Sequence, residues 1–248
     1  MMKSLFVKTT FIAAFGLASI SSAQEVDDDE DFFNEDLEES TSGANVADPF
    51  EKVNRGIFAF NDFVYLKLFK PVAKTYSNVM PDPAEKGIGN FFKNIKYPVR
   101  LTGNVLQLKL GQASKETGSF LIDTTVGLAG FIDVSGTIPE LETTEEDIGQ
   151  ALASWGIGNG FYFVMPFMGP TTLRDFVGGR ADSYVDPLSE PWSPIEKWET
   201  RAVGNTVELI NNSPQLIDIY ERVKESAIDP YEAFKDGYLQ IRTKQIEE

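Results

Sequence analysis

The side chains most often used in nucleophilic and zinc chemistry are missing from this sequence of 248 residues. It contains no histidine and no cysteine. The usual zinc sites and the Ser-His-Asp and Cys-His nucleophile systems therefore cannot be built. No serine begins a Ser-x-x-Lys pattern either. Carboxylate pairs remain possible among 38 acidic residues, but surface acids are mostly solvated. The composition thus argues against an enzyme.

Two short motifs suggest binding chemistry but fit it poorly. The run Gly156-Ile157-Gly158-Asn159-Gly160 resembles a nucleotide loop, yet Phe161 occupies the place of the third glycine and Pro166 soon blocks a helix. Arg174-Asp175 is better explained as a local ion pair at a helix start. The formal net charge of −16 opposes nucleic-acid binding, which needs a basic face.

The segment GNGFYFVMPFMGPTTLRD, residues 158–175, contains an unbroken apolar run. The run is too short to span a bilayer as a helix, and it lacks the alternation of a half-buried strand. We expect it to pair with itself, form a short helix or pack on the fold, because unpaired backbone is costly in lipid. Tyr162 suits an interfacial position. The membrane-contact candidates are Phe161, Tyr162, Phe163, Met165, Phe167 and Met168; a buried loop in an ordinary core is the alternative.

Composition divides the chain into three parts. Residues 1–23 have two lysines, a short apolar core and small residues before Gln24, which is typical of a cleavable signal peptide. Residues 24–47 contain ten acids and no base, which indicates a disordered leader. The leader is either a solvated spacer or a docking tail carried by Phe32, Phe33 and Leu37. Residues 48–248 form the expected folded domain.

That domain repeats one helix-start pattern. A capping side chain is followed by proline at the first helical position and glutamate at the third, which suits the unpaired amides of a helix start. Ser213-Pro214 is expected to begin a further helix. The four full matches are Asp48-Pro49-Phe50-Glu51, Asp82-Pro83-Ala84-Glu85, Ser193-Pro194-Ile195-Glu196 and Asp229-Pro230-Tyr231-Glu232. The pattern predicts an all-α fold.

The first of these helices, after Asp48, is apolar around most of its circumference, which indicates a large core or lipid contact. Its second stripe includes Asn54 and Asn61, whose amides need partners if buried. Further helices are predicted over 99–110, after Gly111 and over 147–155. The glycines at 127, 130 and 136 allow close backbone approach.

Several segments resemble the MlaA (VacJ) family of outer-membrane lipid-asymmetry proteins. They keep the family's order and cover most of the chain after the leader. The matching segments are DPFEKVNRGIFAFND (48–62), KPVAKTYSNVMPDPAEKGIGNFFKNI (70–95), FLIDTTVGLAGFIDV (120–134), EDIGQALASWGIGNGFYFVMPFMGPTTLRD (146–175) and DPYEAFKDGYLQIR (229–242).

The resemblance implies a single ring-shaped multi-helix domain with amphipathic helices and apolar interfacial loops. Such a protein lies in the inner leaflet of a Gram-negative outer membrane and passes misplaced outer-leaflet phospholipids through a polar channel. The implied partners are phospholipid, an MlaC-like periplasmic lipid carrier and a trimeric porin. No catalytic residue, metal or cofactor is implied. The alternatives are a structural porin adaptor with no lipid path and a carboxylate-based hydrolase of envelope glycans or lipids.

The sequence departs from the family pattern in one respect. Well-known members are lipoproteins acylated on a cysteine, and this sequence has no cysteine. We therefore expect amphipathic helices and apolar loops to hold it at the periplasmic face of the outer membrane. The candidates for channel or head-group contact are Asn54, Arg55, Asn61 and Arg174, although the asparagines could instead satisfy backbone groups between elements.

Overall fold

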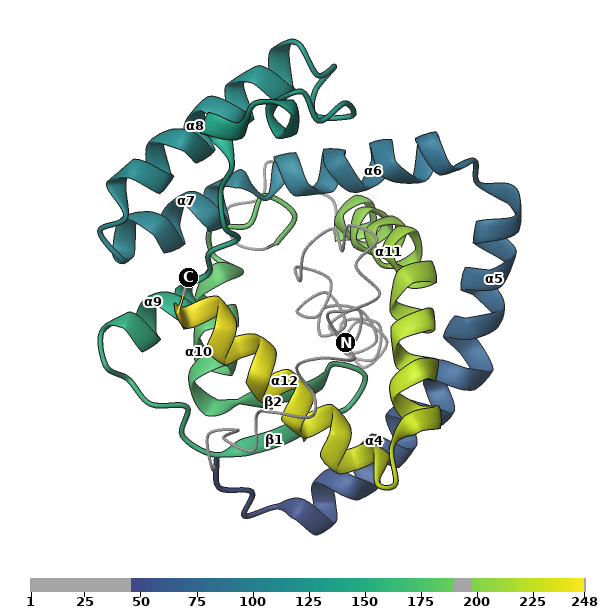
Figure 1. Cartoon of the computed structure of the whole chain (residues 1–248). Helices are drawn as coiled ribbons and strands as arrows, with labels where there is room; N and C mark the ends of the chain where they lie inside the picture. Colours follow the sequence, from purple (N-terminus) through teal and green to yellow (C-terminus); the bar gives the residue numbers. More distant parts are fainter. Residues whose placement is uncertain (1–45, 190–197, 248) are drawn as a thin grey trace.

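The computed structural model describes residues 46–189 and 198–247. The predicted signal peptide, nearly all of the acidic leader and the Ser193-Pro194 start lie outside these ranges. The described residues form helices and one two-stranded sheet, joined by turns and loops. Its helices follow a ring-shaped outline (Figure 1), which confirms the prediction of a mostly helical, ring-shaped fold.

The first part of the ring is one nearly continuous helical stretch. It consists of α4 (Glu51–Val64), the π-helix η1 (Tyr65–Phe69) and α5 (Lys70–Val79), and α6 (Asp82–Ile95) follows after a sharp turn. The wide π-turn falls just before Pro71. Proline has no N–H to donate and its ring would clash with the carbonyl four residues earlier, so the looser turn accommodates it.

The remaining elements complete the ring (Figure 1). Two 3-10 turns separate the middle helices, and a hairpin lies between α9 and α10. In chain order the elements are α7 (Tyr97–Leu106), α8 (Leu110–Thr125), η2 (Ser135–Thr137), η3 (Pro139–Leu141), α9 (Ile148–Ser154), β1 (Tyr162–Met165), β2 (Gly169–Thr172), α10 (Leu173–Asp182), α11 (Trp198–Ser226) and α12 (Pro230–Glu247). α11 packs along α5, and α12 packs against α9 and β2.

The predicted helix caps are only partly correct. Asp229 accepts from the backbone N–H of Tyr231 at 3.0 Å at the start of α12, as predicted. Asp147, which was expected inside a helix over 147–155, instead caps α9 by accepting from Gln150 N. Asp82 is instead the first residue of α6, which has no side-chain cap. Asp48 also caps nothing, because its carboxylate accepts from Asn54 and Tyr231.

The predicted helix start at Ser213-Pro214 is wrong, because Pro214 lies inside α11. In a regular helix the N–H of residue 214 would donate to the carbonyl of Ile210, and proline cannot do so. The hydroxyl of Ser213 donates to that carbonyl at 2.6 Å instead. One side chain thus replaces the missing backbone donor, and the helix continues.

Glycines in the loop after α8 permit the close approach that the sequence suggested. A Cβ on Gly127 would lie 2.2 Å from the carbonyl oxygen of Ile132. Gly130 has φ +90°, and a Cβ there would meet Asn94 at 2.5 Å. The loop is held by Asp123, whose carboxylate accepts from the backbone N–H groups of Val134 and Ser135.

Two apolar clusters hold the ring together. One lies between β1 and α12 and is made by Tyr162, Val164, Tyr231, Tyr238 and Leu239. The other joins η1, α5 and α11 through Tyr65, Ala73 and Ile217. The ring is therefore closed by contacts between segments that are distant in the sequence.

Candidate functional site

The apolar run is a β-hairpin. β1 and β2 pair antiparallel, with Tyr162 opposite Thr172 and Met165 opposite Gly169. Pairing of the run with itself was one of the outcomes expected from the sequence. Burial alternates along β1. Hydrophobicity does not alternate, because apolar groups cover both faces of the strand. Tyr162 and Val164 face the core with α12, whereas Phe163 packs edge-on against Phe176 at 5.7 Å.

Asn54 and Asn61 fasten this hairpin to α4. The buried Asn54 accepts from the N–H of Val164 at 3.0 Å and donates to Asp48 Oδ1 at 2.7 Å. Asn61 accepts from the N–H of Phe167 at 2.7 Å and donates to the carbonyl of Met165 at 2.9 Å. Both amides thus satisfy backbone groups of the hairpin, which is the alternative that the sequence left open for them.

Asn54→Ala should loosen this attachment. It leaves the N–H of Val164 and a carboxylate oxygen of Asp48 without their partner in a buried site, which costs about 1–3 kcal/mol. We expect a lower free energy of unfolding and faster hydrogen exchange at the Val164 amide. Asn78→Ala, at an exposed position of α5, is the control and should change neither. Equal exchange at Val164 in the two variants would contradict the role of Asn54.

The six membrane-contact candidates do not share one environment. Tyr162 is only 1% exposed in the core, so its predicted interfacial position is wrong; its ring packs near those of Tyr231 and Tyr238. Phe167 lies at the hairpin turn with φ +66° and is 37% exposed. Its ring meets that of Phe60 on α4 at 5.0 Å. The other candidates, Phe161, Phe163, Met165 and Met168, are half-buried.

Exposed apolar side chains are numerous beyond the hairpin. From the residue before α4 to the end of α5 they are Phe50, Val53, Phe60, Phe63, Leu68, Val72 and Val79. A second group lies at the turn after α7 and the end of α9, namely Val105, Leu108, Leu110, Trp155 and Ile157. Apolar surface of this extent marks a site of contact with a membrane or a partner. No helix within residues 46–189 and 198–247 has both the length and the hydrophobicity to cross a bilayer.

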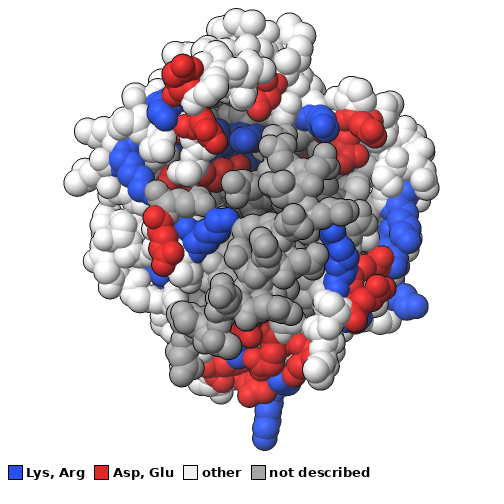
Figure 2. Space-filling model, in the orientation of Figure 1, with Lys and Arg blue, Asp and Glu red and all other residues white. Residues whose placement is uncertain are grey.

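Arg55 and Arg174 are both engaged with acids. Arg55 lies among Glu51, Asp229 and Glu232, and its guanidinium stacks 4.4 Å from the ring centre of Tyr231. Figure 2 shows acidic side chains gathered over α4 and the start of α12. Arg174 is buried and lies 2.9 Å from Asp175, which confirms the local ion pair at the start of α10. A head-group role for either arginine stays a prediction.

A buried charge network joins α9, α10 and α12. Arg242 donates to both carboxylate oxygens of Asp147, at 2.8 and 3.2 Å, and to Asp175 at 3.1 Å. Tyr238 also donates to Asp175, at 2.6 Å. Burial alone would raise the pKa of Asp175, but Arg242 and these hydrogen bonds hold it below its usual value. Sequence reasoning missed this network, because Arg242 is 95 residues from Asp147 and 67 residues from Asp175 in the chain.

Asp182 gives this junction a pH dependence. Burial raises its pKa to about 8, and the nearby charges of Asp147 and Asp186 add to the rise. The hydrogen bond from Ile148 N and the charge of Arg242 lower the pKa and offset part of this effect. A raised pKa in the folded state means that the neutral acid favours folding. The resulting stability is complete below the unfolded-state pKa and is lost as pH rises through about 8.

Asp182→Asn should therefore be more stable than the wild type in alkaline solution. Asparagine keeps the acceptor for Ile148 N and never ionises. We expect its advantage to grow from pH 5 to pH 9 by about 1 kcal/mol or more, since one pKa unit corresponds to ~1.4 kcal/mol. Denaturant unfolding at the two pH values measures this difference. An advantage that does not change with pH would show that Asp182 is ionised in the folded protein.

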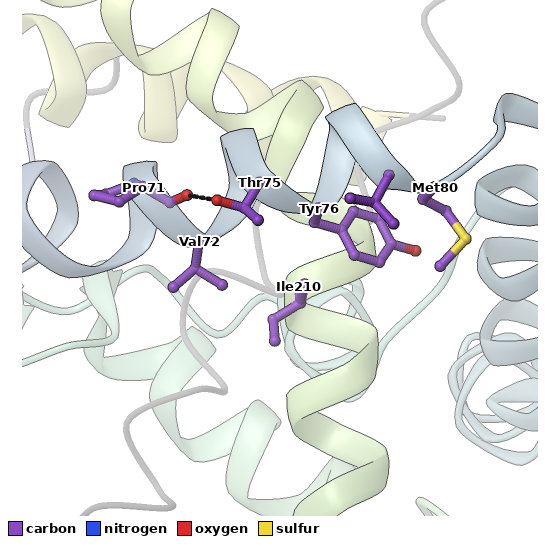
Figure 3. Close-up of a pocket in the computed structure, with 7 residues that line it drawn as sticks. Pro71, Val72, Thr75, Tyr76, Met80 and Ile210 are labelled. Atoms are coloured by element: carbon purple, nitrogen blue, oxygen red, sulfur yellow. Dashed lines mark hydrogen bonds between the residues drawn. The ribbon is translucent and has the colours of Figure 1, made fainter.

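A groove of about 550 Å³ lies between α5 and α11 (Figure 3). Its lining residues are Pro71, Val72, Thr75, Tyr76, Val79, Met80 and Ile210. Sequence reasoning did not predict it, because the two helices are more than a hundred residues apart in the chain. Within the described ranges, no three His, Cys, Asp or Glu side chains gather in a way that could hold a metal ion.

Comparisons with known proteins identify similar chains. The family model for the MlaA lipoprotein matches residues 46–245. The intermembrane phospholipid transport system lipoprotein MlaA of Escherichia coli (strain K12) is 34% identical over 199 residues, covering 78% of this chain and 76% of the relative. An uncharacterised protein of Rickettsia bellii is 29% identical over 221 residues, with 88% and 85% coverage.

A solved structure has a similar fold. It was reported as "Structural basis for maintenance of bacterial outer membrane lipid asymmetry". It superposes with a TM-score of 0.69 at 30% sequence identity, covering 81% of this chain and 99% of the other. The similarity thus extends over nearly all of the described ring.

Proposed function

Because this chain belongs to the MlaA lipoprotein family, we propose that it removes mislocalised phospholipids from the outer leaflet of the outer membrane and transfers them inward. The observation that carries the proposal is the 30% identical solved structure, reported for the maintenance of outer membrane lipid asymmetry. The described ring of helices would surround the route that the phospholipid takes through the protein. The proposal assigns no catalytic step to any residue.

The apolar surface supports residence in the inner leaflet of that membrane. Exposed phenylalanines and valines on α4 and α5 and the hairpin turn at Phe167 supply apolar area, and burial of such area stabilises a monotopic protein in a bilayer. Trp155 is 56% exposed while its indole N–H donates to the carbonyl of Leu106 at 3.0 Å. Its polar group is thus satisfied even when the ring lies among lipid tails. Export by the predicted signal peptide would bring the chain to this membrane.

A passive conduit suits the chemistry of the cargo. Phospholipid tails can keep contact with apolar walls while the head group follows polar side chains, which lowers the cost of bringing a charge through hydrocarbon. Arg55 and Arg174 are already paired with acids. To bind a phosphate head group, their guanidinium groups would have to contact the phosphate and these acids at the same time. We propose an MlaC-like periplasmic carrier as the acceptor and a trimeric porin as the membrane partner.

Disruption of the gene tests the proposal. We expect phospholipid to accumulate in the outer leaflet and sensitivity to detergent to rise, and the wild-type gene should restore both. The measurement is the labelling of surface phospholipid on intact cells. Unchanged outer-leaflet phospholipid after disruption would contradict the proposed function.

A paired variant tests whether the hairpin turn contacts the membrane. Phe60→Asp with Phe167→Asp places two charges where two rings now meet, and we expect loss of membrane retention and of lipid asymmetry. Asn78→Asp adds one charge at an exposed polar position of α5 and serves as the control. Full retention and full asymmetry in the paired variant would exclude this membrane contact.

A further inference from the structure

The side chains that line the groove between α5 and α11 offer no free hydrogen-bond donor to a ligand. Only two lining side chains are polar, and both donate inside the protein: Thr75 Oγ1 to the carbonyl of Pro71 at 2.8 Å, and the Tyr76 hydroxyl to Asn211 Oδ1 at 2.5 Å. Figure 3 shows the first of these bonds along α5. The rest of the lining is aliphatic or thioether side chains. The groove therefore suits a ligand part that is wholly apolar.

The shape of the groove follows from the course of α11. The two helices touch closely where the buried Ala73 of α5 meets Ile217 of α11. Pro214 follows Ser213 within α11, and a proline inside a helix bends it. Figure 1 shows α11 side-on near α4 but end-on near α6, so the helix changes direction along its length. The groove opens on the far side of that bend, beside Ile210.

Apolar surface leads into the groove along both helices. On η1 and α5, Leu68, Val72 and Val79 are 61%, 48% and 76% exposed. On α11, the exposed Val203 and Val207 precede Ile210 at helical spacing and share its face. The groove is thus continuous with the surface of α4, η1 and α5 that is proposed to contact the membrane.

We propose that this groove binds one acyl chain of a membrane phospholipid. The inference rests on the proposed function for the presence of lipid at this surface. The volume of about 550 Å³ falls within the usual range for ligand sites, about 300–1,000 Å³. An extended peptide would bring backbone C=O groups for which the lining side chains have no free donor, and burying those carbonyls unpaired is costly. An acyl chain brings no polar group, and α11 packs against both α5 and α6, so a bound chain would lie beside the inner elements of the ring.

Photocrosslinking in vesicles tests the site. The full-length protein is bound to vesicles of phosphatidylethanolamine and phosphatidylglycerol in which a small fraction of phosphatidylethanolamine carries a diazirine near the end of one acyl chain. After irradiation, mass spectrometry compares labelling of the peptide that contains Ile210 with labelling of the peptide that contains Leu68. We expect the Ile210 peptide to be labelled at least as strongly, although Leu68 is the more exposed.

Filling the groove should remove this labelling. Val72→Trp places an indole in the groove, and we expect the label at Ile210 to fall about tenfold, the change that ~1.4 kcal/mol of lost binding produces. Val177→Trp, at a position of α10 that is 50% exposed against 48% for Val72, is the matched control and should leave the label unchanged. Val79→Trp fills the groove from its other end and should lower the label in the same way. It replaces Val72→Trp in the experiment if Val72→Trp folds poorly.

The outcomes separate the two proposals. Labelling confined to Leu68, or equal labelling of Ile210 in the wild type and in both filled variants, overturns the acyl-chain site. If the wild-type gene restores lipid asymmetry while Ile210 stays unlabelled, the proposed function stands and the site fails. If Ile210 is labelled but gene disruption leaves asymmetry intact, the site stands as a lipid site and the proposed transport role fails.

Discussion

Arg242→Met is expected to lower the free energy of unfolding by about 3 kcal/mol, since removing one partner of a buried ion pair typically costs 3–5 kcal/mol. The partial exposure of Asp147, at 30% of its side chain, places the effect at the lower end, whereas Asp175 is only 8% exposed. Methionine keeps most of the aliphatic volume of arginine, so the loss reports the charge and its hydrogen bonds. Denaturant unfolding followed by circular dichroism measures the change.

Two further variants are needed to interpret the loss of stability in Arg242→Met. Lys86→Met removes a positive charge at an exposed position of α6 and should change stability by less than about 0.5 kcal/mol. Adding Asp175→Asn to Arg242→Met removes one of the carboxylates left without a partner, so the double variant should recover part of the loss. A strictly additive further loss in the double variant would contradict a direct pairing of Arg242 with Asp175.

Gly178→Ala should be at least as damaging, because α9 and α10 touch backbone to backbone. A Cβ on Gly178 would lie 2.4 Å from the nitrogen and 2.5 Å from the Cα of Gly149. Neither atom belongs to a side chain that could rotate away, so the two helices would have to separate. Overpacking typically costs 1–3 kcal/mol. We expect a loss of about 3 kcal/mol in unfolding experiments, because the side chains of Asp175 and Arg242 lie so close to Gly149 that even a Cβ there would be only 3.0 and 2.9 Å from them.

The neighbouring glycine is a matched control with the opposite expected sign. A Cβ on Gly179 would meet nothing within 4 Å, and the residue lies inside the same helix, α10. Glycine inside a helix is less favourable than alanine by roughly 0.5–1 kcal/mol. Gly179→Ala should therefore be neutral or stabilising. If both alanine variants are neutral, the close contact between α9 and α10 is absent in solution.

Local rules allowed several elements to be predicted correctly. Asp229 caps a helix as expected, because an acid before a helix start can accept the unpaired amides whatever the rest of the chain does. The helices predicted over 99–110 and after Gly111 correspond to α7 and α8. α7 begins slightly earlier than predicted, at Tyr97, because proline is tolerated in the first turn of a helix.

The same local rules failed at Ser213-Pro214, where a hydroxyl replaces the missing backbone donor. They also failed at Asp48, whose carboxylate pairs with the side chains of Asn54 and of the distant Tyr231 instead of capping α4.

The sequence by itself determines the helical class and the lack of histidine and cysteine chemistry, and its quoted motifs point to the family. These properties depend on residue type and short spacing. The tertiary structure decides which apolar residues meet solvent. Tyr162 lies in the core and Phe167 lies at the surface, although both belong to the same apolar run. It also decides that Asn54 and Asn61 fasten the hairpin, that Arg242 joins two acids and that a groove opens beside Ile210. The reason is physical, because burial and pairing depend on which distant segments come together when the ring closes.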